Sequence, residues 1–169
     1  MSAILRTCES FGIHEVHLIT AGFRVSPGAA RGAERWVERR RFDTTAASFA
    51  DLRARGFRIY VADLLPGAFT PEDVPVDAPL AVVFGSEMRG VSPEARALAD
   101  GAVRIPMLGL THSLNVSVSA AILLRTIGDR RRALVGGGDL PPEVRADFLA
   151  RAIEADALEK KGLLARTSP

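Results

Sequence analysis

Small polar residues crowd the start of one long apolar helix. Residues 105–125 join a short apolar strand end, a loop rich in small polar residues and this helix, and they place Ser113, Asn115, Ser117 and Ser119 at the helix start. A helix that serves only as core does not need hydroxyls and amides in its first turns. Such side chains cap free backbone N–H groups, and the same end of a helix attracts polar or charged ligands. The pattern therefore favours either a well-capped core helix or a ligand site.

A second candidate group follows an apolar run. Residues 80–84 predict a buried strand, which ends abruptly in Gly85, Ser86 and Glu87, with Gly90 shortly after. Glycine can adopt positive φ and lets a ligand approach the backbone closely. The sequence thus predicts a ligand-binding turn at the end of this strand.

The N-terminal segment contributes one arginine. Residues 2–11 predict an amphipathic helix that carries Arg6 and is closed by Gly12. A lone arginine on a helix is usually solvated, so Arg6 gains meaning only together with the two other segments.

The elements that must position these residues alternate along the chain. Strands are predicted at 15–18, 37–41, 58–62, 80–84 and 102–105, and helices at 2–11, 47–55, 93–99, 114–132 and 142–160. This order favours an α/β fold, with a mainly parallel sheet and helices on both faces. The glycine run 136–138 predicts a flexible break between a domain of residues 1–135 and a C-terminal helical extension, residues 139–169, that packs on it.

Composition excludes several other classes. The chain has 169 residues, 47% of them hydrophobic, which suits one domain with a sizeable core, and no continuous apolar run reaches membrane-spanning length. Its single cysteine, Cys8, excludes an internal disulfide and is expected to be an inert core thiol. Glu9 and His14 interrupt any secretory signal pattern, so we expect a soluble, cytoplasmic protein.

Metal and nucleotide-loop sites are not indicated either. His14, His17 and His112 lack clustered ligand partners in the sequence, and we expect no metal. Neither a Gly-x-Gly-x-x-Gly nor a Gly-x-x-x-x-Gly-Lys pattern occurs.

Arginines are concentrated in one stretch. The net charge is only +2, which does not by itself indicate nucleic acid. The stretch contains Arg24, Arg31, Arg35, Arg39, Arg40 and Arg41. Arginine can form bidentate hydrogen bonds to phosphate, so this stretch favours phosphate binding. The residues expected to bind are Arg31, Arg35, Arg39 and Arg41. The run 130–132 is instead interpreted as a solvated face.

Taken in order, the three segments resemble the three motifs of the SpoU (TrmH) family of RNA ribose 2′-O-methyltransferases, within the SPOUT superfamily. The matching residues are Ser2-Ala-Ile-Leu-Arg-Thr, then Phe84-Gly-Ser-Glu with Gly90-Val-Ser, and then Ile105-Pro-Met with Ser113-Leu-Asn-Val-Ser. The resemblance runs from Ser2 to about Arg132. Likeness to the tRNA guanosine-18 branch lies in Trp36-Val, Phe57-Arg-Ile-Tyr and Ala97-Leu-Ala-Asp-Gly-Ala.

The resemblance implies an S-adenosylmethionine-dependent enzyme that methylates a ribose in structured RNA, with tRNA favoured and rRNA as the alternative. It implies a trefoil knot near residues 80–125 and a homodimer in which the arginine of one subunit completes the cofactor site of the other. Catalysis would rest on Arg6, supported by Glu87, Ser113 and Asn115. The cofactor would contact Ala62, Gly85, Ile105, Met107 and Leu114, and RNA would contact Arg31, Arg35, Arg39 and Arg41. A guanidinium keeps its proton, so anchoring an RNA phosphate and polarising the hydroxyl is easier for Arg6 than acting as a base.

Two departures from the family pattern keep alternatives open. The family's first motif has an asparagine two residues before the position of Ser2, which this sequence begins too late to include, and the N-terminal helical segment that helps tRNA recognition is not in it either. Either the natural start lies upstream, or the protein has lost this segment. A protein that binds cofactor and RNA without catalysing, or a ligand-free dimerisation module, therefore stands beside the enzyme hypothesis. The charge of Asp63, next to the cofactor loop, is unexplained by the sequence.

Overall fold

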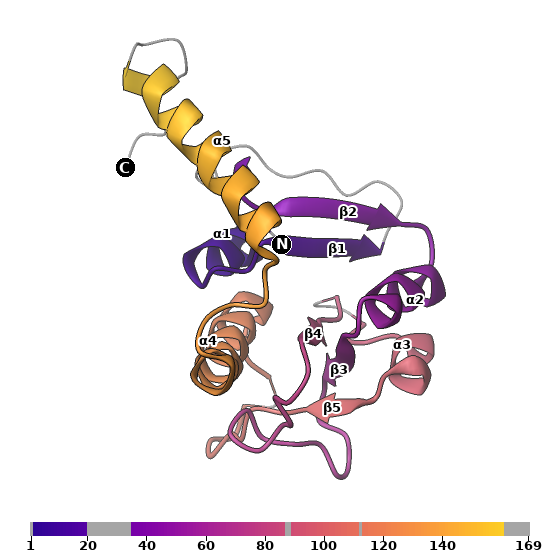
Figure 1. Cartoon of the computed structure of the whole chain (residues 1–169). Helices are drawn as coiled ribbons and strands as arrows, with labels where there is room; N and C mark the ends of the chain where they lie inside the picture. The colour runs from indigo at the N-terminus through magenta and orange to yellow at the C-terminus, as the bar shows by residue number, and fades with distance from the viewer. Residues whose placement is uncertain (1, 20–34, 87–88, 112, 161–169) are drawn as a thin grey trace.

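The computed structural model describes residues 2–19, 35–86, 89–111 and 113–160 (Figure 1). Its elements in chain order are α1 (Ser2–Ser10), β1 (Glu15–Ile19), β2 (Glu38–Phe42), α2 (Thr45–Ala54), β3 (Arg58–Ala62), β4 (Leu80–Val83), α3 (Pro93–Leu98), β5 (Gly101–Val103), α4 (Val116–Val135) and α5 (Pro142–Lys160). None of the helices in these ranges is long and apolar enough to span a bilayer.

Every strand pairing in the described part is parallel. Strands β1 and β2 form one sheet, and β4, β3 and β5 form another in that order. The predicted parallel α/β fold is thus confirmed, although the strands form two sheets instead of one. The expectation that residues 80–84 form a buried strand is wrong: β4 lies at a sheet edge and is half-buried along its length.

Helices cover both faces of the larger sheet, as Figure 1 shows, with α4 on one side and α2 and α3 on the other. Alternation along β3 explains this arrangement, because successive side chains of a strand point to opposite faces. Ile59 and Val61 pack with α2 and α3, whereas Tyr60 joins Leu123 of α4.

A third cluster joins α1 to α4. Leu5 and Cys8 of α1 are buried against Val37, with Leu124 of α4 beside them. Burial raises the pKa of the Cys8 thiol to about 11. A thiol this buried and this weakly acidic forms little reactive thiolate, which agrees with the predicted inert core residue.

Helix boundaries follow local capping chemistry. The hydroxyls of Thr44 and Ser92 accept hydrogen bonds from backbone N–H groups three residues on, at the starts of α2 and α3. Helix α4 continues to Val135, beyond the predicted end at Arg132, because nothing before Gly136 interrupts it. Gly136, at φ 72°, then adopts the left-handed conformation that ends helices most readily.

The arginines at 130–132 do not form a solvated face. Arg130 donates to the carbonyls of Pro71 and Val74, and Arg131 donates to the carbonyl of Val76. Arg132 reaches the carbonyl of Phe11. These side chains therefore fasten α4 to the loop that precedes β4 and to the end of α1.

Helix α5 extends away from the rest of the molecule in Figure 1. Its Phe148 ring makes edge contacts with His14 at 5.5 Å and with Trp36 at 6.1 Å between ring centroids. Leu149 and Ile153 remain exposed on it. The division into a domain and a packing extension stays a prediction, but Phe148 shows where α5 touches the body.

Candidate functional site

A pocket of about 440 Å³ opens where the loops after β3, β4 and β5 meet the start of α4. This volume lies in the range of small-molecule sites. All five residues predicted to contact a cofactor line it: Ala62, Gly85, Ile105, Met107 and Leu114. The structure also brings Ser113 and Asn115 to the same pocket. Residues between 62 and 123 in the sequence thus line one cavity at the carboxyl ends of parallel strands, where ligand sites of α/β sheets lie.

Gly85 closes one wall through close backbone packing. Its φ is not positive, so the expected conformational reason for a glycine is wrong; Gly90 is the residue with φ of 64°. The N–H of Ser86 donates to the Gly90 carbonyl at 3.1 Å, and the N–H of Gly90 donates back at 2.8 Å. A Cβ added at Gly85 would lie 1.9 Å from the Gly90 carbonyl carbon. Only glycine fits this crossing of two backbone segments.

Asn115 caps the start of α4. Its Oδ1 accepts hydrogen bonds from the N–H of Ser117 at 2.9 Å and from the Ser117 hydroxyl at 2.7 Å. Its amide Nδ2, within the described part of the chain, donates to no other group. The capped helix of the first expectation is therefore present, and the amide group of its cap residue lies at the pocket with its donors unused by the described residues.

Two of the predicted catalytic residues, Arg6 and Glu87, are not placed at the pocket by the described residues. Arg6 is exposed on α1 and is not among the residues that line the pocket. Among the described residues it makes no hydrogen bond or ion pair. Glu87 lies outside the described residues. The pocket mouth is open as well: Ser113 and Asn115 are exposed, and Leu114 is 37% exposed.

The pocket contains charged residues that the sequence did not assign to it. Asp63 follows β3 directly and Arg104 follows β5 directly, and both line the cavity. Their places at the ends of predicted strands were the available signal.

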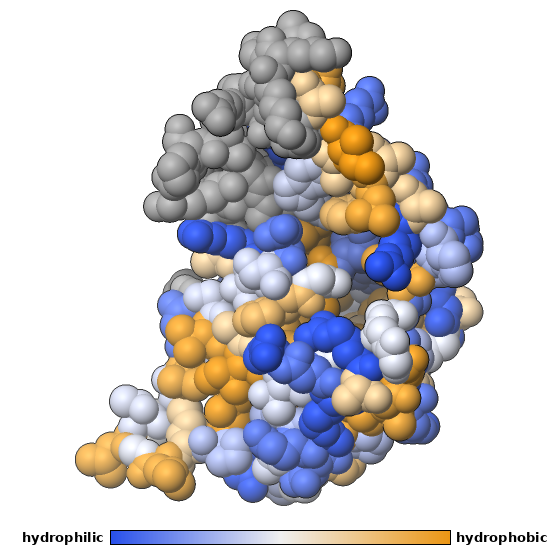
Figure 2. Space-filling view, turned by 60° about the vertical axis from the view of Figure 1, so that its left-hand side comes forward, coloured by the Kyte–Doolittle hydropathy of each residue, from blue (hydrophilic) through white to orange (hydrophobic). Residues whose placement is uncertain are grey.

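The surface beside this pocket is unusually apolar. Leu108 and Leu110 are 103% and 98% exposed, in the loop between β5 and α4. Figure 2 shows hydrophobic side chains at the surface in several places. Large apolar residues that are wholly solvated usually mark a contact surface when they cluster.

The predicted phosphate-binding arginines separate into different environments. Arg31 lies outside the described residues, whereas Arg35, Arg39 and Arg41 are exposed on and just before β2. Arg40 points the other way and forms a two-pronged ion pair with Asp51 at 2.6 and 2.8 Å.

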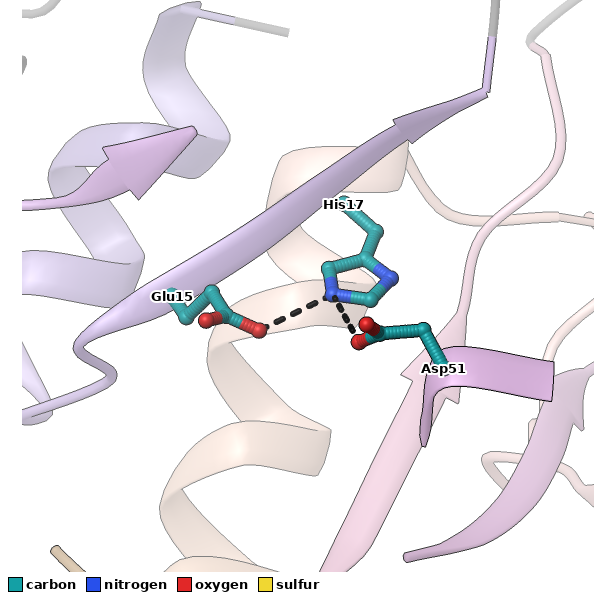
Figure 3. Close-up of side chains that lie close together, drawn as sticks. All are labelled: Glu15, His17 and Asp51. Carbon is teal, nitrogen blue, oxygen red and sulfur yellow. Dashed lines mark hydrogen bonds and ion pairs between the residues drawn. The ribbon is translucent and has the colours of Figure 1, made fainter. Parts of the chain in front are cut away.

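The expectation that His17 lacks clustered ligand partners is wrong. Its Nε2 lies 2.9 Å from Oε1 of Glu15 and 3.8 Å from Oδ2 of Asp51, as Figure 3 shows. His112 lies outside the described residues. The three side chains of Figure 3 could in principle hold a metal ion.

Two guanidinium groups already engage the carboxylates of this cluster. Arg40 binds Asp51, and Arg55 binds both Glu15, at 2.5 Å, and Asp51, at 3.2 Å. Burial opposes ionisation of Glu15 and Asp51, but their hydrogen bonds to arginine outweigh it, and the pKa of each carboxyl lies below its ordinary value. A cation would have to displace both arginines, so the cluster is an ion-pair network that joins β1, β2 and α2.

Comparison with known proteins gives consistent results. Residues 1–125 match the model of the SpoU rRNA Methylase family. The tRNA (guanosine(18)-2′-O)-methyltransferase of Thermus thermophilus is 42% identical over 155 residues, which cover 89% of this chain and 79% of that protein. The Escherichia coli enzyme of the same name is 36% identical over 126 residues, 73% of this chain and 55% of its own length.

Solved structures agree in fold. The crystal structure of the A. aeolicus TrmH/SpoU tRNA modifying enzyme superposes with a TM-score of 0.77 at 30% identity, covering 91% of this chain and 81% of that one. A SpoU methyltransferase from Streptomyces viridochromogenes, AviRb in complex with AdoMet, gives a TM-score of 0.70 at 23% identity over 78% of this chain and 55% of its own, a likeness of fold alone.

Proposed function

This chain belongs to the SpoU rRNA methylase family, and from that premise we propose that it methylates the ribose 2′-hydroxyl of guanosine 18 in tRNA with S-adenosylmethionine as methyl donor. The observation that carries the proposal is the convergence of the second- and third-motif residues on one pocket. The relatives from Thermus and Escherichia, which act on guanosine 18 of tRNA by name, support the choice of substrate.

The pocket suits an adenosine-containing donor. Its walls combine apolar side chains, such as Ile105 and Leu114, with small residues and a backbone crossing at Gly85 that leaves no room for a Cβ. Flat apolar walls can sandwich an adenine ring, and exposed loop backbone can supply its hydrogen bonds. Ile105 and Leu114 would hold the ring, while Ala62 and Gly85 would offer backbone groups.

The donor, when bound, supplies the methyl group; positioning the acceptor falls to side chains of the protein. The Nδ2 donors of Asn115 and the hydroxyl of Ser113 stand at the pocket mouth, where an entering ribose would meet them. Arg6 would anchor an RNA phosphate and polarise the 2′-hydroxyl, whose proton passes toward that phosphate. Fixed donors and a guanidinium act chiefly by holding developing charge in place. Glu87 completes the set that the family motif implies.

We propose that two copies of the chain form the working site. Arg6 is exposed and absent from the pocket of its own chain, while the pocket mouth and the neighbouring Leu108 and Leu110 are solvated. A second copy covering this loop would bury both leucines and bring its Arg6 to the open pocket. The trefoil knot around residues 80–125 belongs to the same proposal, because it would draw the three pocket loops together.

RNA would lie along the exposed arginines of β2 and the segment before it, Arg35, Arg39 and Arg41, with Arg31 beyond. Ribosomal RNA is the second candidate substrate, favoured only by the description of the family model. A protein that binds donor and RNA without transfer is the third candidate, because Arg6 does not line the pocket of its own chain.

Transfer of labelled methyl groups from S-adenosylmethionine to total tRNA and to rRNA tests the proposal. Label confined to 2′-O-methylguanosine at position 18 of tRNA is the expected result. Label in rRNA alone would show that rRNA, not tRNA, is the substrate. Binding of donor and tRNA with no transfer would support the non-catalytic alternative. A tRNA with 2′-deoxyguanosine at position 18 serves as the matched control and should accept no label.

A further inference from the structure

One carboxylate in the donor pocket has no role in the chemistry described so far. Asp63 follows β3 directly, lines the cavity, and has a side chain that is only 18% exposed. Placing a charge in such a site is costly unless it is paired and hydrogen-bonded. The residue therefore needs an account of both its stability and its purpose.

Two contacts fix this carboxylate, and a third fixes the backbone of Asp63. Its Oδ2 accepts a hydrogen bond from Nε of Arg96 at 2.6 Å, and its Oδ1 accepts one from the N–H of Leu64 at 2.8 Å. The N–H of Asp63 itself donates to the carbonyl of Val103 at 3.1 Å, across the β3–β5 pairing. The carboxylate is thus held at the edge of the cavity by Arg96 of α3 and by the backbone after β3, while its own backbone is tied to β5.

Acceptor capacity remains after these contacts. A carboxylate offers about four lone-pair positions on two oxygens, and each oxygen of Asp63 uses one of them. A rigid pair of neighbouring acceptors suits a pair of neighbouring donors. Adjacent ribose hydroxyls are such a pair, whereas an adenine ring presents one amino group and is better matched to the apolar walls.

Arg96 also determines the charge that the ligand group should carry. Because its guanidinium neutralises Asp63, the ion pair as a whole offers hydrogen-bond acceptance without a net negative charge. Arg104, which lines the same cavity and follows β5 next to Asp63, adds a positive charge. These surroundings disfavour the ammonium group at the amino-acid end of the donor and favour neutral hydroxyls.

We propose that Asp63, held by Arg96, accepts hydrogen bonds from the ribose hydroxyls of the methyl donor and makes the pocket selective for a ribonucleoside. The inference rests on the proposed function, since it requires an adenosine-containing ligand. In a purely structural role, Asp63 would only join the end of β3 to α3 through its ion pair with Arg96. The experiment must distinguish this role from ligand binding.

Calorimetric binding of S-adenosylhomocysteine and of its 2′-deoxy and 3′-deoxy analogues provides that separation. Hydrogen bonds to charged groups are each worth roughly a tenfold change in affinity or more. The wild type should bind S-adenosylhomocysteine at least about tenfold more tightly than one of the analogues, and in Asp63→Ala this ratio should fall toward one. This ratio compares two ligands on the same variant. A general loosening of the pocket would weaken both ligands alike and would leave the ratio unchanged.

Asp77→Ala is the matched control. Asp77 forms a two-pronged ion pair with Arg58 at 2.9 and 2.8 Å, is 62% exposed, and does not line the pocket. It should keep the wild-type ratio. Asp63→Asn, of the same shape, serves if the alanine variant does not fold, and it should reduce the ratio because a neutral amide oxygen is a weaker acceptor.

Distinct outcomes overturn distinct claims. An unchanged ratio in the Asp63 variants, or no preference for the ribose form in the wild type, overturns the inference alone. 5′-Methylthioadenosine lacks the amino-acid end; if Asp63→Ala weakens S-adenosylhomocysteine but not this compound, the carboxylate binds the ammonium group and the ribose assignment is wrong. Wild-type protein that fails to bind S-adenosylhomocysteine at millimolar concentration overturns the proposed function, and this inference with it.

Discussion

Replacement of Gly85 by alanine tests whether the pocket depends on the backbone crossing that forms its wall. The added Cβ would lie 1.9 Å from the Gly90 carbonyl carbon, 2.2 Å from its oxygen and 2.2 Å from the N of Val91. All three are backbone atoms, so no side chain can rotate away. Ordinary contact begins at 3.4 Å, so the two segments must separate by about 1.5 Å.

That separation breaks the two hydrogen bonds between Ser86 and Gly90. Each contributes about 1 kcal/mol net, and overpacking costs about 1–3 kcal/mol more, so Gly85→Ala should lower the free energy of unfolding by roughly 3–5 kcal/mol. For a chain of this size the melting temperature should fall by roughly 6–20 °C. The affinity for S-adenosylhomocysteine should fall at least about tenfold, since the displaced segment lines the pocket.

Thermal unfolding and calorimetric titration measure both effects. Gly138→Ala is the matched control, because a Cβ there meets nothing within 4 Å and the residue does not line the pocket. The control should keep wild-type stability and affinity. A Gly85→Ala protein with the wild-type melting temperature and affinity would refute the close crossing and the pocket built on it.

Three further changes probe the catalytic residues and the ion-pair network. Arg6→Ala should leave the affinity for S-adenosylhomocysteine unchanged and reduce methyl transfer to tRNA by roughly two to three decades, the usual loss for a contact made mainly in the transition state; near-full activity on tRNA would show that the proposed mechanism is wrong. Asn115→Ala should lose the cap to Ser117, about 1 kcal/mol of stability, together with methyl transfer, whereas Asn115→Asp should keep the cap and still lose transfer, as unfolding and transfer assays can show. Because the pKa values of Glu15 and Asp51 are depressed in the folded protein, their ion pairs stabilise the fold above the ordinary carboxyl pKa of about 4, and this stability is lost as the pH falls through the lower folded values. The melting temperature of Asp51→Asn should accordingly depend less steeply on pH below about 4 than that of the wild type, and parallel curves would contradict this.

Local chemistry was readable from the sequence. A helix was predicted over residues 93–99, and α3 begins at Pro93 behind the cap of Ser92. The polar residues ahead of the apolar stretch predicted a capped helix, and Asn115 caps α4. A cap joins a side chain to a backbone N–H two or three residues on, so its partners are fixed by sequence spacing alone. The family is confirmed for the same reason, since its three motifs are short runs read in order along the chain.

Long-range pairing was decided only by the tertiary structure. The sequence left the charge of Asp63 unexplained, and only the fold brings Arg96, 33 positions later, to its carboxylate. Likewise Arg130 and Arg131 bind carbonyls more than 50 positions away. With 22 basic and 20 acidic residues in the chain, many pairings are chemically equivalent, and only distance in space selects among them. Arg6 shows the same limit: the family resemblance implies a catalytic role for it, but the tertiary structure does not place it among the residues that line the pocket.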